Sequence, residues 1–204
     1  MACKLTQEQI DQTISFHGHW CPGLASGIRA AEWALNELCA RSRDEELVAV
    51  VETDMCGVDA IQFLTGCTFG KGNLIHKDYG KNAFTFYRRS DGKAARLVAK
   101  PQMYGDAQQT LGQLHRKRQT EGLTDEEETV WEQTRAMMAK HIMESDLADL
   151  FEIGKSDGPA PQKARILSSL ICDKCGESVM ESRTRRLQEQ TLCIPCFESM
   201  EKKL

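Results

Sequence analysis

Apolar residues recur at helical spacing near the start of the chain. The large residues after Pro22 lie three or four positions apart, which predicts a helix with one buried face that runs to about Arg41. The residues of this face are Leu24, Ile28, Ala31, Leu35 and Leu38. A shorter helix is predicted before it, because Thr6 and Gln9 form a capping-box pattern, and this helix should end near Phe16.

The middle of the chain is richer in β-branched and aromatic residues. Residues 47–52 predict a short buried strand, and the apolar spacing after Gly57 predicts a helix that follows it directly. Residues 83–88 and 95–100 predict two further strands, which a hairpin turn at residues 90–93 connects. The pattern therefore predicts alternating helices and strands, with three clear strands.

The second half of the chain shows weaker patterns. Residues 101–123 are polar and predict no definite element, whereas Thr124 and Glu127 form a second capping box that predicts a helix. Ser145 should cap a last short helix at residues 146–153. The stretch that follows is rich in glycine and proline, so we predict a core domain at 1–153, a linker at 154–165 and a small domain at 166–204.

Composition narrows the function classes. The net charge of −4 gives no general attraction to nucleic acid, although the chain from Lys163 onward carries eight Lys/Arg against six Asp/Glu. No secretory signal and no apolar run of membrane-spanning length is present, so we expect a cytoplasmic protein without a membrane association. Nine cysteines in such a chain are expected to be reduced and connected with metal binding.

Four cysteines near the C-terminus form two C-x-x-C pairs: Cys172 with Cys175 and Cys193 with Cys196. Seventeen residues separate the pairs, a spacing that is typical of a structural zinc site. Four thiolates complete a tetrahedron around Zn²⁺ and leave no open position, so the predicted role is structural. An iron–sulfur centre is the alternative, because four thiolates also bind iron.

A second group of candidate ligands lies near the N-terminus. His17, His19 and Cys21 alternate with other residues, and in an extended segment such residues face the same side. Cys21 and Cys56 each precede a predicted helix, where a thiolate is favoured by the helix N-terminus. We predict that these four residues form a core site, as metal ligands or with Cys21 or Cys56 as a catalytic thiol.

Other residues are weaker candidates. Asp54, Asp59 and Cys67 are plausible neighbours of the core site, because they lie in or near the same predicted turns. The isolated histidines are predicted to be structural or solvated; they are His76, His115 and His141.

Several long segments together resemble one known family. They are FHGHWCPG at 16–23, DMCGVDAIQ at 54–62, TGCTFGKGN at 65–73 and DYGK at 78–81. They are similar to the FmdE-like family of formylmethanofuran dehydrogenase proteins over roughly residues 10–152, and the Cys₄ segment looks like a zinc finger found in some members. The resemblance implies an α+β, thioredoxin-like core with a mixed sheet of about five strands flanked by helices, and a homodimer.

The resemblance also shapes the functional expectation. We expect a metal-binding accessory protein with structural zinc and a second metal in the core, which supports a molybdenum- or tungsten-dependent formate-type oxidoreductase or handles metal. One alternative is a thiol-dependent enzyme or redox protein that uses Cys21 or Cys56 with a histidine base. Another alternative is a module that binds a partner through the zinc finger.

Overall fold

The computed structural model describes residues 2–38, 46–156 and 158–201. The chain forms two compact units, residues 1–163 and residues 164–204, and each is described by itself. In the described ranges, none of the helices is both long enough and apolar enough to cross a membrane.

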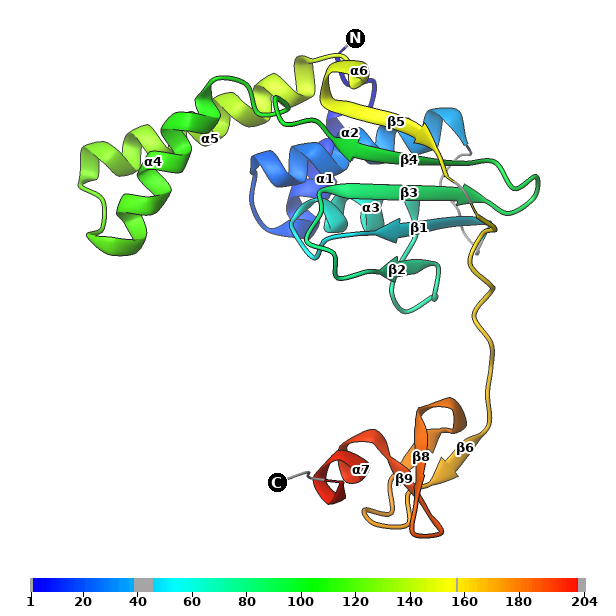
Figure 1. Cartoon of the computed structure of the whole chain (residues 1–204). Coiled ribbons are helices and arrows are strands. Elements are labelled where there is room, and N and C mark those ends of the chain that lie inside the picture. Colours follow the sequence, from blue (N-terminus) through cyan, green and yellow to red (C-terminus); the bar gives the residue numbers. More distant parts are fainter. Residues whose placement is uncertain (1, 39–45, 157, 202–204) are drawn as a thin grey trace. The chain divides into compact units, whose positions relative to one another are not determined.

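The larger unit is built around a mixed five-stranded sheet in the order β2-β1-β3-β4-β5 (Figure 1). The strands are β1 (Leu47–Val51), β2 (Leu74–His76), β3 (Ala83–Arg88), β4 (Ala94–Ala99) and β5 (Phe151–Lys155). Only β1 and β2 pair in parallel, and the connection between them contains a helix, as a parallel pair requires. The pairs β1–β3, β3–β4 and β4–β5 are antiparallel.

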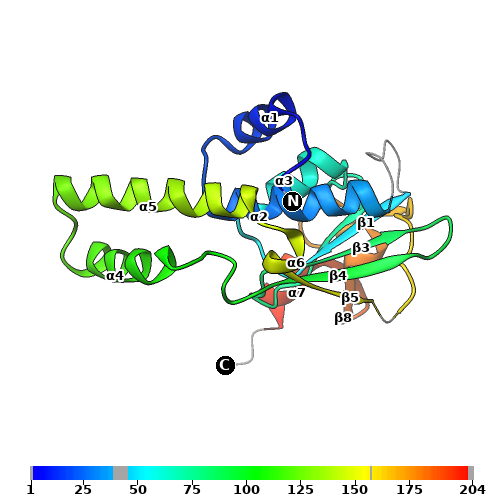
Figure 2. The same cartoon turned by 90° about the horizontal axis from the view of Figure 1, so that it is seen from above.

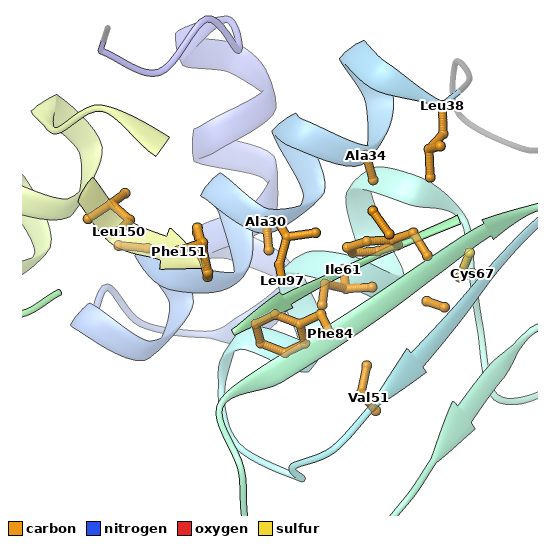
Figure 3. Close-up of a cluster of buried hydrophobic side chains, with 14 of the residues drawn as sticks. Ala30, Ala34, Leu38, Val51, Ile61, Cys67, Phe84, Leu97, Leu150 and Phe151 are labelled. Carbon is orange, nitrogen blue, oxygen red and sulfur yellow. The ribbon is translucent and has the colours of Figure 1, made fainter. Parts of the chain in front are cut away.

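Helices pack on one face of this sheet, where α2 lies along the strands (Figure 2). The helices of this unit are α1 (Gln7–His17), α2 (Pro22–Glu37), α3 (Gly57–Thr65), α4 (Ala107–Thr120), α5 (Asp125–Glu144) and α6 (Leu147–Leu150). Figure 3 shows the core between the layers, where Ala30 of α2 faces Phe84 and Leu97 of the sheet. All five residues of β1 are buried, which explains its continuous apolar run.

The contact between α2 and α3 is unusually close. A Cβ atom added at Gly27 of α2 would overlap the carbonyl oxygen and Cα of Gly57, the first residue of α3. A Cβ atom added at Gly57 would lie 3.0 Å from the carbonyl oxygen of Gly23. The two backbones therefore touch directly, and only glycine permits this approach.

Helices α4 and α5 form an antiparallel pair that extends beyond the sheet (Figures 1 and 2). The C-terminal part of α5 packs on α2, and its buried residues include Met138 and Ile142. None of the residues of α4 is buried. We refer to this pair, Ala107–Thr120 with the N-terminal part of α5, as the helical arm.

The smaller unit consists of two short hairpins and a helix. β6 (Ser169–Ile171) pairs with β7 (Ser178–Met180), and β8 (Thr184–Leu187) pairs with β9 (Gln190–Cys193). The 3₁₀ turn Glu181–Arg183 connects the hairpins, and α7 (Ile194–Met200) follows β9. Its buried apolar core consists of Leu192 and the cysteines Cys172 and Cys193, which is too small to fold a domain by burial alone.

The structure confirms the α+β class and the five-stranded mixed sheet, while the thioredoxin-like comparison stays a prediction. The capping boxes at Thr6 and Thr124 are both formed. The sequence did not predict β2, β5 or α4: β2 has only three residues, the apolar spacing before β5 is helical, and α4 has no buried stripe. The helix α2 ends at Glu37 with Leu38 as its cap, and Arg41 lies outside the described residues.

The helix expected at residues 146–153 is wrong in its second half. Only Leu147–Leu150 is helical, and its N-cap is Asp146, whereas Ser145 ends α5. The chain then enters β5, where backbone bonds to β4 replace the helical pattern. Gly154 and Lys155, which were expected to begin the linker, are the last residues of this strand.

The close helix contact gives a first prediction. Replacing Gly27 with alanine forces α2 and α3 apart, so the free energy of unfolding should fall by about 2–3 kcal/mol. Urea denaturation followed by tryptophan fluorescence measures this, since Trp20, Trp33 and Trp131 all lie in the larger unit.

The matched control is Gly112→Ala, in the interior of α4. A Cβ atom added there meets nothing within 4 Å, so the change should stabilise the protein by about 0.5–1 kcal/mol. Equal stability of the Gly27→Ala variant and the wild type would contradict the close contact.

Candidate functional site

Four potential metal ligands meet where three helices come together. His17 is the last residue of α1, Cys21 is the N-cap of α2 and Cys56 is the N-cap of α3, while His19 lies in the turn between α1 and α2. One nitrogen or sulfur atom from each of the four residues lies within 4.8 Å of the others. We refer to these four residues as the core site.

The local chain path differs from the extended segment expected from the sequence. His17 is helical, and Gly18 ends α1 with a φ of 93°, a conformation that favours glycine. This tight turn brings the ring of His19 back toward His17, with the two ring centroids 4.4 Å apart. The convergence therefore comes from a helix end and a reversal, not from strand alternation.

The His17 ring is held in one orientation. Its Nδ1 atom lies 2.7 Å from a carboxylate oxygen of Asp59, which is in the first turn of α3. Its Nε2 atom is buried and has no hydrogen-bond partner in the described part of the chain. A metal-binding histidine typically shows this arrangement, with a carboxylate on one nitrogen and the metal on the other.

The two cysteines differ in their surroundings. The Cys21 sulfur accepts a hydrogen bond of 3.3 Å from the Leu24 N–H and caps α2 as predicted. Burial raises the pKa of the Cys56 thiol, and the charge of nearby Cys21 raises it further. A positive charge beside the two sulfurs, such as a metal cation, would favour the thiolate form of Cys56.

A cavity of about 560 Å³ opens beside the two cysteines. Two residues of the core site, Cys21 and Cys56, line it, and the helical arm and the loop that contains Tyr104 form other walls. Asn82 donates a hydrogen bond of 3.2 Å to the Tyr104 hydroxyl. Burial raises the pKa of this hydroxyl, so it is protonated at neutral pH.

The remaining sequence candidates occupy different places. Asp59 contacts the core site through His17, whereas Asp54 is exposed. Cys67 is fully buried in the hydrophobic core, where its thiol contacts the Leu47 carbonyl oxygen at 3.4 Å. His115 lines the cavity.

Most of the residues that line the cavity were not singled out as candidates by the sequence analysis. Tyr104 and the cavity-lining residues of α4 lie in the segment that predicted no definite element. Trp131 and Arg135 are four residues apart on the helix predicted after Thr124, a spacing that places them on one face but does not by itself indicate a cavity.

The second cluster lies in the smaller unit. The sulfur atoms of Cys172, Cys175, Cys193 and Cys196 lie within 4.8 Å of one another. Those of Cys175 and Cys193 are 3.9 Å apart, close to the ~3.8 Å edge of a tetrahedron with Zn–S bonds of about 2.3 Å. The cluster thus has the dimensions of a closed Cys₄ metal site.

The cysteines of this cluster differ in how readily they ionise. Backbone N–H groups of Cys175 and Cys193 lower the pKa of Cys172 to about 6. By contrast, the interaction with Cys193 and burial raise the pKa of Cys196 to about 12. A metal ion at the cluster would favour the thiolate form of all four cysteines.

Comparison with known proteins assigns both units. Residues 16–152 match the family described as FmdE, molybdenum formylmethanofuran dehydrogenase operon. The chain belongs to the FmdE family. Residues 165–202 match the prokaryotic dksA/traR C4-type zinc finger, which favours zinc over an iron–sulfur centre at the Cys₄ cluster.

Two individual proteins are similar to this FmdE-family chain. A probable S-adenosyl-L-methionine-binding protein of Archaeoglobus fulgidus is 30% identical over 197 residues, covering 90% of this chain. The chain spans about half of that relative, 51% of its length. The crystal structure of a tungsten formylmethanofuran dehydrogenase FmdE-like protein from Syntrophus aciditrophicus has the same fold, with a TM-score of 0.63 and 22% identity, covering 100% of this chain and 98% of that one.

The Cys₄ geometry gives a second prediction. The Cys193→Ser variant should lose one zinc per chain and the fold of the smaller unit, because its apolar core is too small without the metal. Metal analysis by mass spectrometry and limited proteolysis measure the two effects, while tryptophan fluorescence of the larger unit should not change.

The matched control is Cys3→Ser, which makes the same substitution outside both clusters. It should keep the full metal content and the protease resistance of the smaller unit. Full zinc content in the Cys193→Ser variant would exclude this residue as a ligand.

Proposed function

We propose that this FmdE-family chain is a metal-binding accessory protein whose core site holds a second metal ion. The observation that carries the proposal is the buried, unpaired Nε2 atom of His17, which belongs to a cluster of two imidazoles and two thiols. An unpaired buried nitrogen is costly, and a metal ion at the cluster would supply its missing partner.

The donor set fits a borderline-soft divalent ion. Two histidine nitrogens and two cysteine sulfurs are ligands of Zn²⁺ and of several other transition metals. Such an ion would stabilise both thiolates and would act as a Lewis acid toward a group beside it. Asp59 would fix the ring orientation and tautomer of His17.

The proposed accessory role concerns the enzyme that this chain would support. The family description refers to an operon of a molybdenum enzyme, and the zinc finger forms a compact unit of its own. We therefore propose that the chain forms a homodimer and supports a molybdenum- or tungsten-dependent formate-type oxidoreductase, or delivers metal.

A thiol-dependent enzyme is the second candidate, and the cavity beside Cys21 and Cys56 is the observation that favours it. The raised pKa of the Cys56 thiol counts against a free thiolate nucleophile at this position near neutral pH. Rapid alkylation of a single core cysteine in the metal-free protein would support the enzyme, whereas alkylation blocked by bound metal would support the metal site.

Metal content tests the leading proposal. The wild type should carry two metal ions per chain, and Cys21→Ser should carry one, because the zinc finger keeps its own. Mass spectrometry of the purified proteins measures this, with Cys3→Ser as the control that should keep both ions. Equal metal content in the Cys21→Ser variant and the wild type would contradict the proposed metal site in the core.

The Asp59→Asn variant tests the core site without removing a metal ligand. The amide leaves the ligands in place but weakens the hold on the His17 ring, so the affinity of the core site should fall about 10- to 100-fold. Competition with a chromophoric chelator measures the affinity. Asp54→Asn, an exposed carboxylate on the same connection, is the matched control and should have no effect.

A further inference from the structure

The cavity beside the core site has the size of a small-molecule binding site. Its volume of about 560 Å³ lies within the range of 300–1,000 Å³ that is common for ligand pockets. It is bounded by the sheet, by the N-termini of α2 and α3, and by both helices of the arm. All of its lining residues belong to the larger unit.

The cavity lining carries basic side chains and, among the described residues, no acidic ones. Among the described residues that line the cavity, none is a carboxylate, although the whole chain has 30 Asp/Glu against 26 Lys/Arg. Arg135 contributes a guanidinium and His115 a titratable ring. One guanidinium nitrogen donates a hydrogen bond of 3.1 Å to the largely exposed Glu132, and among the described residues no other hydrogen bond of Arg135 is found, so its remaining N–H donors can bind a ligand.

Aromatic side chains form the walls of the cavity. Phe84 comes from the sheet, Tyr104 from the loop before α4, and Trp131 from α5. Phe84 and Trp131 are largely buried. Aromatic walls of this kind bind flat apolar groups by stacking and edge contacts.

Gly112 keeps the cavity open on the side of α4. The residues of α4 that line the cavity are Gln108, Leu111, Gly112 and His115, which share one helical face. Gly112 lies within this face, and a Cβ atom added there meets nothing within 4 Å. A glycine in a helix interior weakens the helix, so its presence here preserves space at a cost in stability.

We propose that this cavity binds a small organic anion with a flat apolar body. The anionic group lies near Arg135 and His115, the body lies between the aromatic side chains, and the far end reaches Cys21 and Cys56. Charge complementarity with a carboxylate-free lining selects an anion over a cation of the same shape. The proposal does not depend on a metal at the core site.

The test uses the full-length protein and three probes with one aromatic body: 2-naphthoate, 2-naphthylmethanol and 2-naphthylmethylammonium. Titration calorimetry should show 2-naphthoate binding at least about tenfold more tightly than either of the others, as expected for a charge-assisted hydrogen bond. Arg135→Gln should remove this preference. Arg118→Gln is the matched control, because Arg118 also lies over the Trp131 ring but does not line the cavity.

A second variant separates binding from folding. Gly112→Leu fills the cavity while it favours the helix, so it should abolish 2-naphthoate binding without lowering the melting temperature. Gln113→Leu places the same side chain at an exposed position of α4 and should bind normally. Both variants should keep the metal content of the wild type, so a failed ligand proposal is distinguishable from a failed metal proposal.

Three outcomes would overturn the inference. One is equal affinity for the anionic and cationic probes, and another is undiminished 2-naphthoate binding by Gly112→Leu. The third is the absence of binding by all three probes, as expected if a second copy of the chain fills the cavity.

Discussion

The structure depends on one backbone contact, the approach of Gly27 in α2 to Gly57 in α3. Because no side chain separates the helices here, their N-termini lie close enough for Cys21 and Cys56 to share one site. A Cβ atom added at Gly23 would already lie 3.2 Å from the Cβ of Cys56. The glycines therefore set the distance between the two thiols, and the core site is a consequence of helix packing.

The same contact brings the thiols of Cys21 and Cys56 close to the imidazole of His17. The Cys56 thiol, whose pKa is raised by burial and by the nearby Cys21, lies close to the buried Nε2 atom of His17, which has no hydrogen-bond partner in the described part of the chain. This unpaired nitrogen lowers stability in the metal-free protein. The cation that we propose for the core site would pair with both sulfurs and with the Nε2 atom of His17. On that proposal, the arrangement serves binding at a cost in the stability of the fold.

The sequence was informative where the physical cause is local. Capping boxes involve residues three positions apart, so the starts of α1 and α5 could be predicted from Thr6 and Thr124. The C-x-x-C pairs are equally local. Strand β5 could not be predicted, because Leu147, Leu150 and Phe151 continue a helical apolar spacing and only pairing with β4 decides the outcome. The cavity is lined by residues that are distant in the sequence, such as Phe84 and Trp131, and no local pattern indicates that they line one space.

The two cysteine clusters differ in what surrounds them, and this difference assigns their roles. The Cys₄ cluster supplies four sulfurs, so a bound metal has no open position, and Leu192 and the cysteines form the centre of the small unit. The core site instead borders a cavity of about 560 Å³ with aromatic walls and a guanidinium. A site that only stabilises a fold gains nothing from such a space, because close packing is more stable than an open cavity. The open space beside Cys21 and Cys56 is therefore the physical reason to place function in the larger unit.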